Sequence, residues 1–269
     1  MAENERLPQE TIDLVSDLVR KSAGEALGWF RQRELRTNTD NKAAAGYDPV
    51  TIADRAVEDA LRAGIHELFP GDAVLGEERG ISGVGERRWI IDPIDGTRAF
   101  VTGQPLWGVL VALYRGDEPI AGWSYMPVLD EMYVAANGTA TLRGPDGFRT
   151  LRSSDVVGLD DAVLACTHPS MFAPGAEAAR FWALEQQCKL SRFGGDCMNW
   201  LLLADGYIDL VVENDLYVYD VGSLIPTIEA AGGVITGLDG GPAIRGGFVV
   251  GAATPELHAA ALKVLTQTA

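Results

Sequence analysis

Two stretches in the first third of the chain carry apolar residues at helical spacing. Between residues 11 and 30, and again between 52 and 68, the apolar positions return every three or four residues, the period of one helix face. The polar segment RTNTDNKAAAGYDP, residues 36–49, separates the two stretches. The dipeptide Pro70–Gly71 ends the second stretch. The pattern predicts two amphipathic helices.

Short apolar segments rich in β-prone residues follow, at residues 89–92, 106–114, 120–125 and 131–135. Only short turns separate the last three, which predicts an antiparallel meander. Beyond residue 150, β-prone and helical segments alternate, which favours a second sheet with helices packed on it. We therefore expect a mixed α+β and α/β protein. Its N-terminal α+β domain would cover residues 1–150 and its C-terminal α/β domain residues 151–269.

Composition narrows the classes of function. The chain has 22 basic against 38 acidic residues, a net charge of −16, which disfavours nucleic acid and anionic membranes as partners. Its three cysteines form no CxxC spacing and its three histidines lie far apart, which argues against a disulfide framework and a zinc site. The N-terminus lacks a signal-peptide pattern and no apolar run is long enough to span a membrane, so we expect a cytoplasmic protein.

The segment WIIDPIDGT, residues 89–97, carries the most chemical information. Strand alternation would point Asp92 and Asp95 to opposite faces, because their offset is odd. We expect Pro93 to help end the strand, so that the chain bends and both carboxylates face one point. Gly96 and Thr97 then offer backbone N–H groups at a predicted helix start, where anions bind well.

Three further carboxylates have a structural and a functional interpretation. Glu77, in GEE at residues 76–78, follows a short apolar strand and is either solvated or a metal ligand. Asp54 occupies the third position of the second helix, where it forms a capping box with Thr51 and still lies near enough to Thr97 to orient a hydroxyl or a water. Asp220 precedes an apolar helix that ends in EAAGG, where it is either an N-cap or a metal ligand.

Together these residues predict a Mg²⁺-dependent phosphomonoesterase. Mg²⁺ prefers hard oxygen ligands. Several carboxylates and one backbone carbonyl can hold two such ions roughly 3.5–4 Å apart. Ions bound in this way activate a water molecule and neutralise charge on phosphoryl oxygens, so no nucleophilic serine or cysteine is required.

The chain resembles the inositol monophosphatase family. The resemblance rests on the kind, order and spacing of three features, GEE, WIIDPIDGT and the late Asp220. The resemblance spans about residues 10–265. It implies a layered αβαβα sandwich, Mg²⁺ dependence, lithium sensitivity in some members and a homodimer.

The resemblance also assigns roles to metal ligands. Glu77, Asp92 and the Ile94 carbonyl would bind a first ion, and Asp92, Asp95 and Asp220 a second. A third, weaker ion would rest on Glu77 and water, which makes Glu77 part of the catalytic set.

The remaining assigned roles concern the attacking water and the phosphate. Thr97 and Asp54 would activate the water. The backbone amides of Gly96 and Thr97 would hold the phosphate.

One branch of the family fits best. Where many inositol phosphatases have Trp-Asp followed by small residues, this chain has YDVGSLIP at 219–226. Its segments KAAAGYDPVT, FGGDCMNW and VVENDLYVYD are similar to the histidinol-phosphate phosphatases, enzymes of histidine biosynthesis.

In that branch, four residues would line the substrate pocket: Gly194, Gly195, Asp196 and Glu213. The structural alternatives are a helix N-cap for Asp196 and a solvated strand end for Glu213. His168 is predicted to be a structural loop residue.

Other substrates and another class of protein remain open. Inositol 1-phosphate is the main alternative substrate, followed by 3′-phosphoadenosine 5′-phosphate and fructose 1,6-bisphosphate. A second phosphate would need basic residues, and in the second half of the chain Lys189 and Arg192 are the only candidates near the predicted pocket. A non-catalytic regulatory protein on the same scaffold would be expected to lose metal ligands, whereas here a carboxylate stands at each ligand position.

Overall fold

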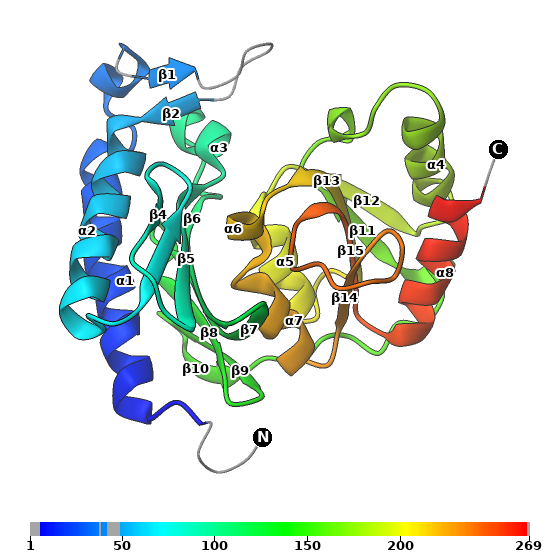
Figure 1. The fold of residues 1–269 in the computed structure, drawn as a ribbon. Coiled ribbons are helices and arrows are strands. Elements are labelled where there is room, and N and C mark those ends of the chain that lie inside the picture. Colours follow the sequence, from blue (N-terminus) through cyan, green and yellow to red (C-terminus); the bar gives the residue numbers. More distant parts are fainter. Residues whose placement is uncertain (1–5, 38, 42–48, 268–269) are drawn as a thin grey trace.

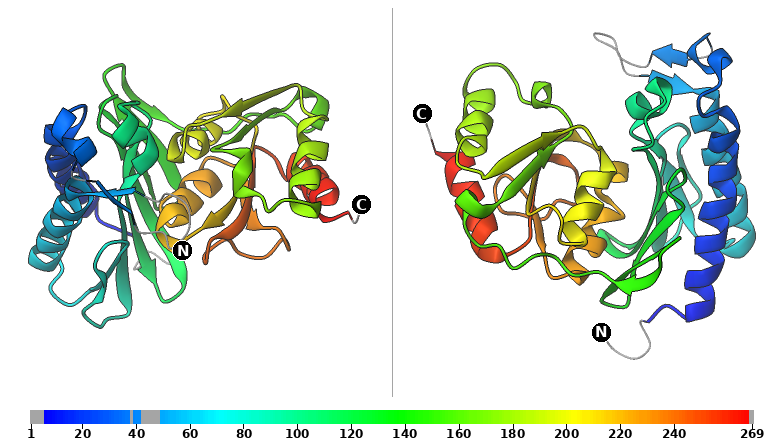
Figure 2. Two further views of the ribbon diagram at one scale, coloured as in Figure 1. Left: turned by 90° about the horizontal axis from the view of Figure 1, so that it is seen from above. Right: turned by 180° about the vertical axis from the view of Figure 1, so that it is seen from behind.

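A computed structural model describes residues 6–37, 39–41 and 49–267 and shows five layers, which confirms the predicted αβαβα sandwich (Figures 1 and 2). The outer layers contain α1 (Gln9–Trp29) and α2 (Ile52–Leu68) on one side, and α4 (Ala176–Glu185) and α8 (Pro255–Thr266) on the other. The middle layer contains α5 (Cys197–Ala204), α6 (Val218–Val221) and α7 (Leu224–Ala230). A sheet lies on each side of this middle layer.

Both predicted N-terminal helices are confirmed. The sequence placed the second helix at residues 52–68, the bounds that α2 has in the structure. Its apolar stripe of Ala53, Val57, Leu61 and Ile65 is fully buried and shares a hydrophobic cluster with the adjacent sheet. Burial of this stripe holds α2 on the sheet, because packing of an amphipathic face supplies most of a helix's stability.

The first sheet contains the predicted meander and extends it at both edges. In spatial order its strands are β10 (Gly147–Thr150), β9 (Thr139–Gly144), β8 (Glu131–Ala136), β7 (Glu118–Met126), β6 (Gly108–Arg115), β5 (Arg87–Asp95), β3 (Ala73–Gly76) and β4 (Gly80–Ser82). β6, β7 and β8 pair antiparallel, as expected from their short turns. A separate two-stranded ribbon joins β1 (Thr39–Asn41) and β2 (Pro49–Thr51).

The second sheet mixes parallel and antiparallel strands. Its order is β12 (Leu190–Phe193), β11 (Val163–Cys166), β13 (Leu210–Leu216), β15 (Gly247–Ala252) and β14 (Val234–Gly237). The first three are parallel because α4 and α5 provide the crossovers, whereas β15 runs antiparallel to both of its neighbours. The short helix α3 (Thr97–Thr102) and three 3₁₀ helices, Arg33–Thr37, Leu159–Asp161 and Pro169–Met171, complete the described elements.

A hydrophobic cluster joins the two halves of the chain. It combines Leu110 and Met126 of the first sheet with Trp200 and Ile225 of the middle layer. The division into domains at residue 150 stays a prediction, and this cluster lies across it.

The turn between α6 and α7 packs against β7 without space for a side chain. A Cβ at Gly122 would lie 2.3 Å from the carbonyl oxygen of Ser223. The hydroxyl groups of Ser124 and Ser223 are 2.9 Å apart and fix the same contact. Asp220 therefore lies on a segment whose distance from the sheet depends on a glycine.

We expect Gly122→Ala to destabilise the protein by about 1–3 kcal/mol, the usual cost of overpacking. Urea unfolding measures this loss. Gly28→Ala in α1 is the control, because among the described residues no atom lies within 4 Å of its added Cβ. That control should be neutral or stabilising, since alanine favours helices. An unchanged urea midpoint for Gly122→Ala would contradict the tight contact.

Candidate active site

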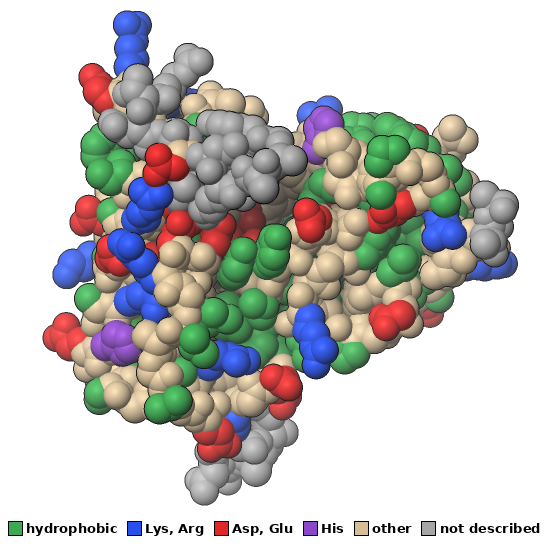
Figure 3. All heavy atoms as spheres, turned by 45° about the horizontal axis from the view of Figure 1, so that its top comes forward, with side chains coloured by type: hydrophobic (Ala, Val, Ile, Leu, Met, Phe, Trp, Pro, Cys, Tyr) green, Lys and Arg blue, Asp and Glu red, His purple; other side chains and the backbone are tan. Residues whose placement is uncertain are grey.

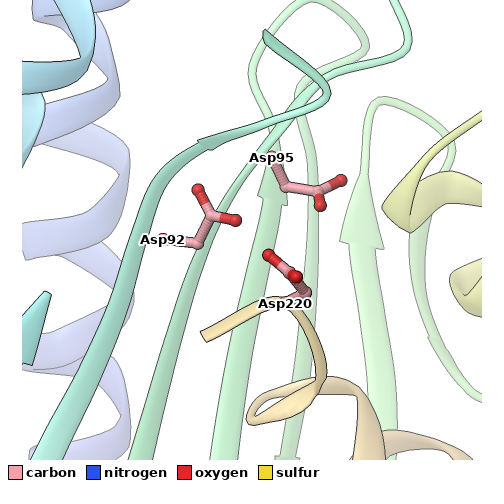
Figure 4. A group of neighbouring side chains, drawn as sticks. All are labelled: Asp92, Asp95 and Asp220. Atoms are coloured by element: carbon pink, nitrogen blue, oxygen red, sulfur yellow. The ribbon is translucent and has the colours of Figure 1, made fainter. Parts of the chain in front are cut away.

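Three aspartates from two distant segments face one another between the first sheet and the middle layer (Figure 4). Asp92 and Asp95 lie at the end of β5, and Asp220 lies in α6. One carboxylate oxygen from each lies within 4.8 Å of the other two. On the face in Figure 3, acidic side chains are scattered, with several of them close together left of the centre. The structure thus brings together the three residues predicted to share one metal ion.

A β-bulge points Asp92 and Asp95 in a common direction. Asp92 pairs with Leu110 and Asp95 with Gly108, so three steps along β5 match two along β6. The extra residue compensates for the odd offset, which would otherwise turn one carboxylate away. The expectation that Pro93 ends the strand is wrong, since β5 continues to Asp95. The proline lies inside the bulge, where the ladder does not need its missing N–H.

The predicted helix start after Asp95 is confirmed. Gly96 is the N-cap of α3 (Thr97–Thr102) and has a left-handed φ of 82°. A Cβ there would lie 2.9 Å from the Leu106 carbonyl oxygen, so both the conformation and the space require glycine.

Asp220 is positioned by a one-turn helix of its own. Its Oδ2 atom accepts a hydrogen bond of 2.6 Å from the Tyr217 N–H. The alternative that Asp220 caps the helix ending in EAAGG is wrong, because that helix is α7 and its N-cap is Ser223. α6 is a separate helix from α7, and Asp220 faces Asp92 and Asp95 from it.

Glu77 lies near the three aspartates but does not belong to the cluster that their carboxylates form. Its N–H donates to the Ile91 carbonyl at 3.2 Å, next to Asp92. Among the described residues, the group of three or more acidic, histidine or cysteine side chains with ligand atoms within 4.8 Å of one another consists of the three aspartates, without Glu77. The charge of Glu77 nevertheless raises the pKa values of Asp92 and Asp220. Its role as a metal ligand stays a prediction.

The electrostatics of the cluster favour a divalent cation. Burial, then the charges of Glu77, Asp95 and Asp220, hold the pKa of Asp92 well above its ordinary value. Burial is also the first cause that raises the pKa values of Asp95 and Asp220 to about 7. The strongest charged influences on Asp92 are all acidic, so the site concentrates negative charge that a bound cation would neutralise. These oxygen donors fit Mg²⁺.

Asp54 and Thr97 meet at the edge of this cluster. The predicted capping box is confirmed, since the N–H and hydroxyl of Thr51 donate to Asp54 Oδ2 at 2.8 and 2.6 Å. The other oxygen, Oδ1, lies 3.5 Å from the Thr97 hydroxyl, which also lies 3.0 Å from the Ile94 carbonyl oxygen. Burial raises the pKa of Asp54 to about 6. One oxygen of Asp54 is anchored while the other faces the hydroxyl.

The segment before α5 brings Asp196 to the turn at Gly96. Gly194 and Gly195 have φ values of 87° and 131°, which only glycine adopts readily. A Cβ at Gly96 would lie 3.2 Å from the Asp196 side chain. The Cys197 N–H donates to Asp95 Oδ2 at 2.7 Å and joins this segment to the aspartate cluster. Asp196 occupies the N-cap position of α5, as the structural alternative expected, but in the described part of the chain its side chain caps no N–H of that helix.

Glu213 lies within electrostatic reach of Asp196, and hydrogen bonds from the protein hold its carboxylate. Only 2% of the residue is exposed, so the alternative of a solvated strand end is wrong. Its Oε1 accepts from the N–H and hydroxyl of Thr167 at 2.8 and 2.7 Å, and its Oε2 from the Trp200 indole at 3.0 Å. Its contact with substrate stays a prediction. Burial, then the charges of Asp95 and Glu213, raise the pKa of Asp196 to about 8.

Sequence reasoning missed several groups that support the site. Thr167 and Trp200 hold Glu213 and carry no motif that would identify them. Tyr219 lies within electrostatic reach of Glu77 and Asp220, and its only sequence signal is that it directly precedes Asp220.

Three other expectations have different outcomes. The His168 ring caps the turn at Ser170, which fits the expected loop role. Residues 42–48 of the segment KAAAGYDPVT lie outside the described residues. No described helix is long and apolar enough to cross a membrane, and the cytoplasmic location stays a prediction.

Comparison with known proteins identifies the family of this site. The model of the inositol monophosphatase family matches residues 8–268. A histidinol-phosphatase of Streptomyces coelicolor is 33% identical over 97% of this chain and 99% of its own length. Another, of Mycobacterium tuberculosis, is 38% identical over 75% of this chain and 79% of its own.

A solved structure shows the same relationship. An inositol monophosphatase from Zymomonas mobilis is 32% identical, covers 96% of this chain and 98% of its own, and superposes with a TM-score of 0.83. The protein is therefore a phosphoric monoester hydrolase with an acidic cluster suited to divalent metal ions. The chain belongs to the inositol monophosphatase family.

Proposed function

We propose that this metal-dependent phosphomonoesterase hydrolyses L-histidinol phosphate to L-histidinol and phosphate, using two or three Mg²⁺ ions. The observation that carries the choice of substrate is the contact between Asp196 and the turn at Gly96. A carboxylate beside the predicted phosphate site suits a substrate that carries positive charge close to its phosphate.

The position of Asp196 defines what the substrate should offer. The backbone amides of Gly96 and Thr97, at the start of α3, would hold the phosphate. Burial and acidic neighbours disfavour the ionised form of Asp196, whose pKa is about 8. A substrate ammonium would reverse this effect and form a charge-assisted hydrogen bond. Inositol 1-phosphate offers neutral hydroxyl groups and gains less.

The other site residues are assigned to metal binding and water activation. Asp92, Asp95 and Asp220, with Glu77 and the Ile94 carbonyl, would hold Mg²⁺. When bound, Mg²⁺ activates a water molecule and neutralises the charge that develops on the phosphoryl oxygens.

The protein's own contribution to water activation is a short hydrogen-bonded relay. The Thr97 hydroxyl would orient the attacking water and pass a proton towards Asp54 Oδ1. Asp54 is held in place for this through its other oxygen by Thr51.

The similar proteins support this proposal and supply the second candidate. Two of them are histidinol-phosphatases from Streptomyces coelicolor and Mycobacterium tuberculosis. The inositol monophosphatase from Zymomonas mobilis favours inositol 1-phosphate as the alternative. A bisphosphate is less well supported, because Lys189 and Arg192 are exposed on or next to β12.

The proposal includes a homodimer, which light scattering during gel filtration would test.

We expect kcat/KM for L-histidinol phosphate to exceed that for inositol 1-phosphate by at least about tenfold. A charge-assisted hydrogen bond contributes roughly 1.5–3 kcal/mol, which corresponds to one to two decades. Asp196→Asn should narrow the gap by weakening this bond. Steady-state phosphate release with both substrates measures the ratio.

The exposed Asp160 provides a matched control, because Asp160→Asn removes the same charge from the same half of the chain. The ratio of kcat/KM for L-histidinol phosphate to that for inositol 1-phosphate should be the same in Asp160→Asn as in the wild type. Equal or better turnover of inositol 1-phosphate by the wild type would move the protein to the alternative substrate.

A further inference from the structure

A buried ion pair on α2 lies next to the catalytic cluster and has no assigned role. Glu58 is fully buried and lies one turn after Asp54. Its Oε1 accepts a hydrogen bond of 2.7 Å from Nε of Arg62, of which 9% is exposed. Removing two charges from water is costly unless further hydrogen bonds satisfy them. The location of those bonds therefore indicates what the pair holds.

Four further hydrogen bonds of the pair end on the turn after Glu77 and on β4, and a fifth, from Arg62, ends on the Val74 carbonyl oxygen of β3 at 3.4 Å. Glu58 accepts from the N–H of Glu78 at 2.7 Å and from that of Arg79 at 3.1 Å. Arg62 donates to the Ser82 hydroxyl at 2.8 Å and to the Gly80 carbonyl. One carboxylate and one guanidinium thus bind the β3–β4 hairpin at four points that follow Glu77.

The residue before Glu77 is fixed by the same carboxylate. A Cβ at Gly76 would lie 2.2 Å from Glu58 Oε1, so the end of β3 packs directly on Glu58. Glu77 itself donates its N–H to Ile91. Its backbone is therefore held on both sides by Glu58 and in the middle by the strand that carries Asp92.

We propose that Glu58, charge-balanced by Arg62, is a positioning residue that holds Glu77 for metal binding. This inference rests on the proposed function in one respect, because it takes Glu77 to be a metal ligand. Glu58 contacts neither substrate nor metal in this role. It fixes the main chain from which the Glu77 carboxylate extends, and outer groups of this kind set the affinity of a metal site.

The test is Glu58→Gln, which keeps the shape of the side chain and replaces one acceptor oxygen with a donor. The new NH₂ group would face the N–H of Glu78 or Arg79, and two donors cannot form a hydrogen bond with each other. We expect Mn²⁺, used as the probe and counted by electron paramagnetic resonance, to bind at least about tenfold more weakly, the usual cost of losing such a partner. The Mg²⁺ concentration for half-maximal activity should rise in parallel, while kcat at saturating Mg²⁺ changes less.

Asp59→Asn is the matched control. Asp59 is the next residue of α2 and bonds the side chain of the same Arg79 at 2.7 and 3.0 Å, yet it is exposed. Its loss should leave Mn²⁺ binding unchanged, because surface ion pairs contribute little. A loss equal to that of Glu58→Gln would show that any change near this turn weakens the site and would overturn the assigned role.

A double-mutant cycle separates positioning from general destabilisation. If Glu58 acts through Glu77, then Glu58→Gln should cost little further Mn²⁺ affinity when Glu77→Gln is already present. Equal losses in both backgrounds would overturn the proposal, as would unchanged binding by folded Glu58→Gln. Should that variant fail to fold, Arg62→Lys, which keeps the charge and loses donors to the turn, should weaken Mn²⁺ binding in the same direction. Unchanged binding by folded Arg62→Lys would then overturn the proposal.

These results are independent of the substrate. A wild type that binds Mn²⁺ and does not hydrolyse L-histidinol phosphate would defeat the proposed substrate alone. The binding measurements would still decide the role of Glu58.

Discussion

Replacing Asp92 with asparagine is expected to remove more than about nine-tenths of kcat, a loss above roughly 1.4 kcal/mol. The variant should remain folded, because asparagine keeps the shape of the side chain and can still accept the Ile94 N–H, now 3.1 Å from Asp92 Oδ1. Activity should fail because Asp92 is the carboxylate assigned to both principal metal ions.

The same substitution should stabilise the metal-free protein at pH 7.5. Burial and like charges raise the pKa values of Asp95 and Asp220 to about 7 and that of Asp92 well above normal. The folded state therefore binds more protons than the unfolded state between about pH 4 and 7, and its stability falls as pH rises through this window. Asp92→Asn removes one repelling carboxylate. The gain should disappear below about pH 3, where the carboxylates are protonated in both states.

Phosphate release and thermal unfolding with EDTA or Mg²⁺ check both expectations. Wild-type activity should vanish with EDTA and return with Mg²⁺. Asp117→Asn is the control, since it removes a charge from a side chain that is 84% exposed and should change neither activity nor stability appreciably. A variant at Asp92 that keeps more than about a tenth of wild-type kcat would contradict the expectation that Asp92 would bind both ions.

The features that the sequence predicted well are those with local causes. The bounds of α2 follow from its own apolar period, from Thr51 and Asp54 at its start, and from Pro70 beyond its end. Each of these signals lies within or next to the helix itself. The β6–β7–β8 meander was predictable for the same reason, because short turns leave neighbouring strands few alternatives.

The geometry at Asp92 and Asp95 could not be derived from β5 alone. The bulge is defined by pairing with β6, where Leu110 and Gly108 oppose the two aspartates. The sequence of β5 shows only a proline between two acids, which fits a strand end and a bulge equally well. The prediction that the carboxylates converge was therefore correct for a wrong structural reason.

Burial of charge was the other feature that sequence did not reveal. Glu58 and Arg62 have the spacing of an ordinary surface pair on a helix. Their burial depends on Gly76, which lies on another element and leaves space for the carboxylate. Glu213 likewise depends on Thr167, a residue 46 positions away. Such partners are set by tertiary packing, and a single sequence does not identify them.

The edge strand β10, near residue 150, was not predicted because it is exposed. All four residues of β10 are exposed at the edge of the first sheet, so the segment shows no apolar alternation. Strand assignment from sequence relies on a buried face, which an edge strand of this kind lacks.

The hydroxyl of Thr97 should be needed for the chemical step far more than for binding. We expect Thr97→Ala to lower kcat by about 10²-fold or more, the usual contribution of a positioned proton-transfer group, with a smaller change in KM. The reason is geometric, because the hydroxyl lies between the Ile94 carbonyl at 3.0 Å and Asp54 Oδ1 at 3.5 Å. Orienting the water lowers the free energy of the transition state and leaves ground-state binding almost unchanged.

Two variants and one isotope experiment test this role of Thr97. Thr97→Ser keeps the hydroxyl and should recover most of kcat, whereas Thr102→Ala, at an exposed threonine of the same helix, should leave kcat at the wild-type value.

Because water attacks the phosphorus directly in this scheme, reaction in ¹⁸O water should place the label in the released phosphate. No phosphoenzyme should accumulate. A trapped covalent phosphoprotein, or a Thr97→Ala enzyme that loses only substrate affinity, would show that the hydroxyl has a different role from orienting the water.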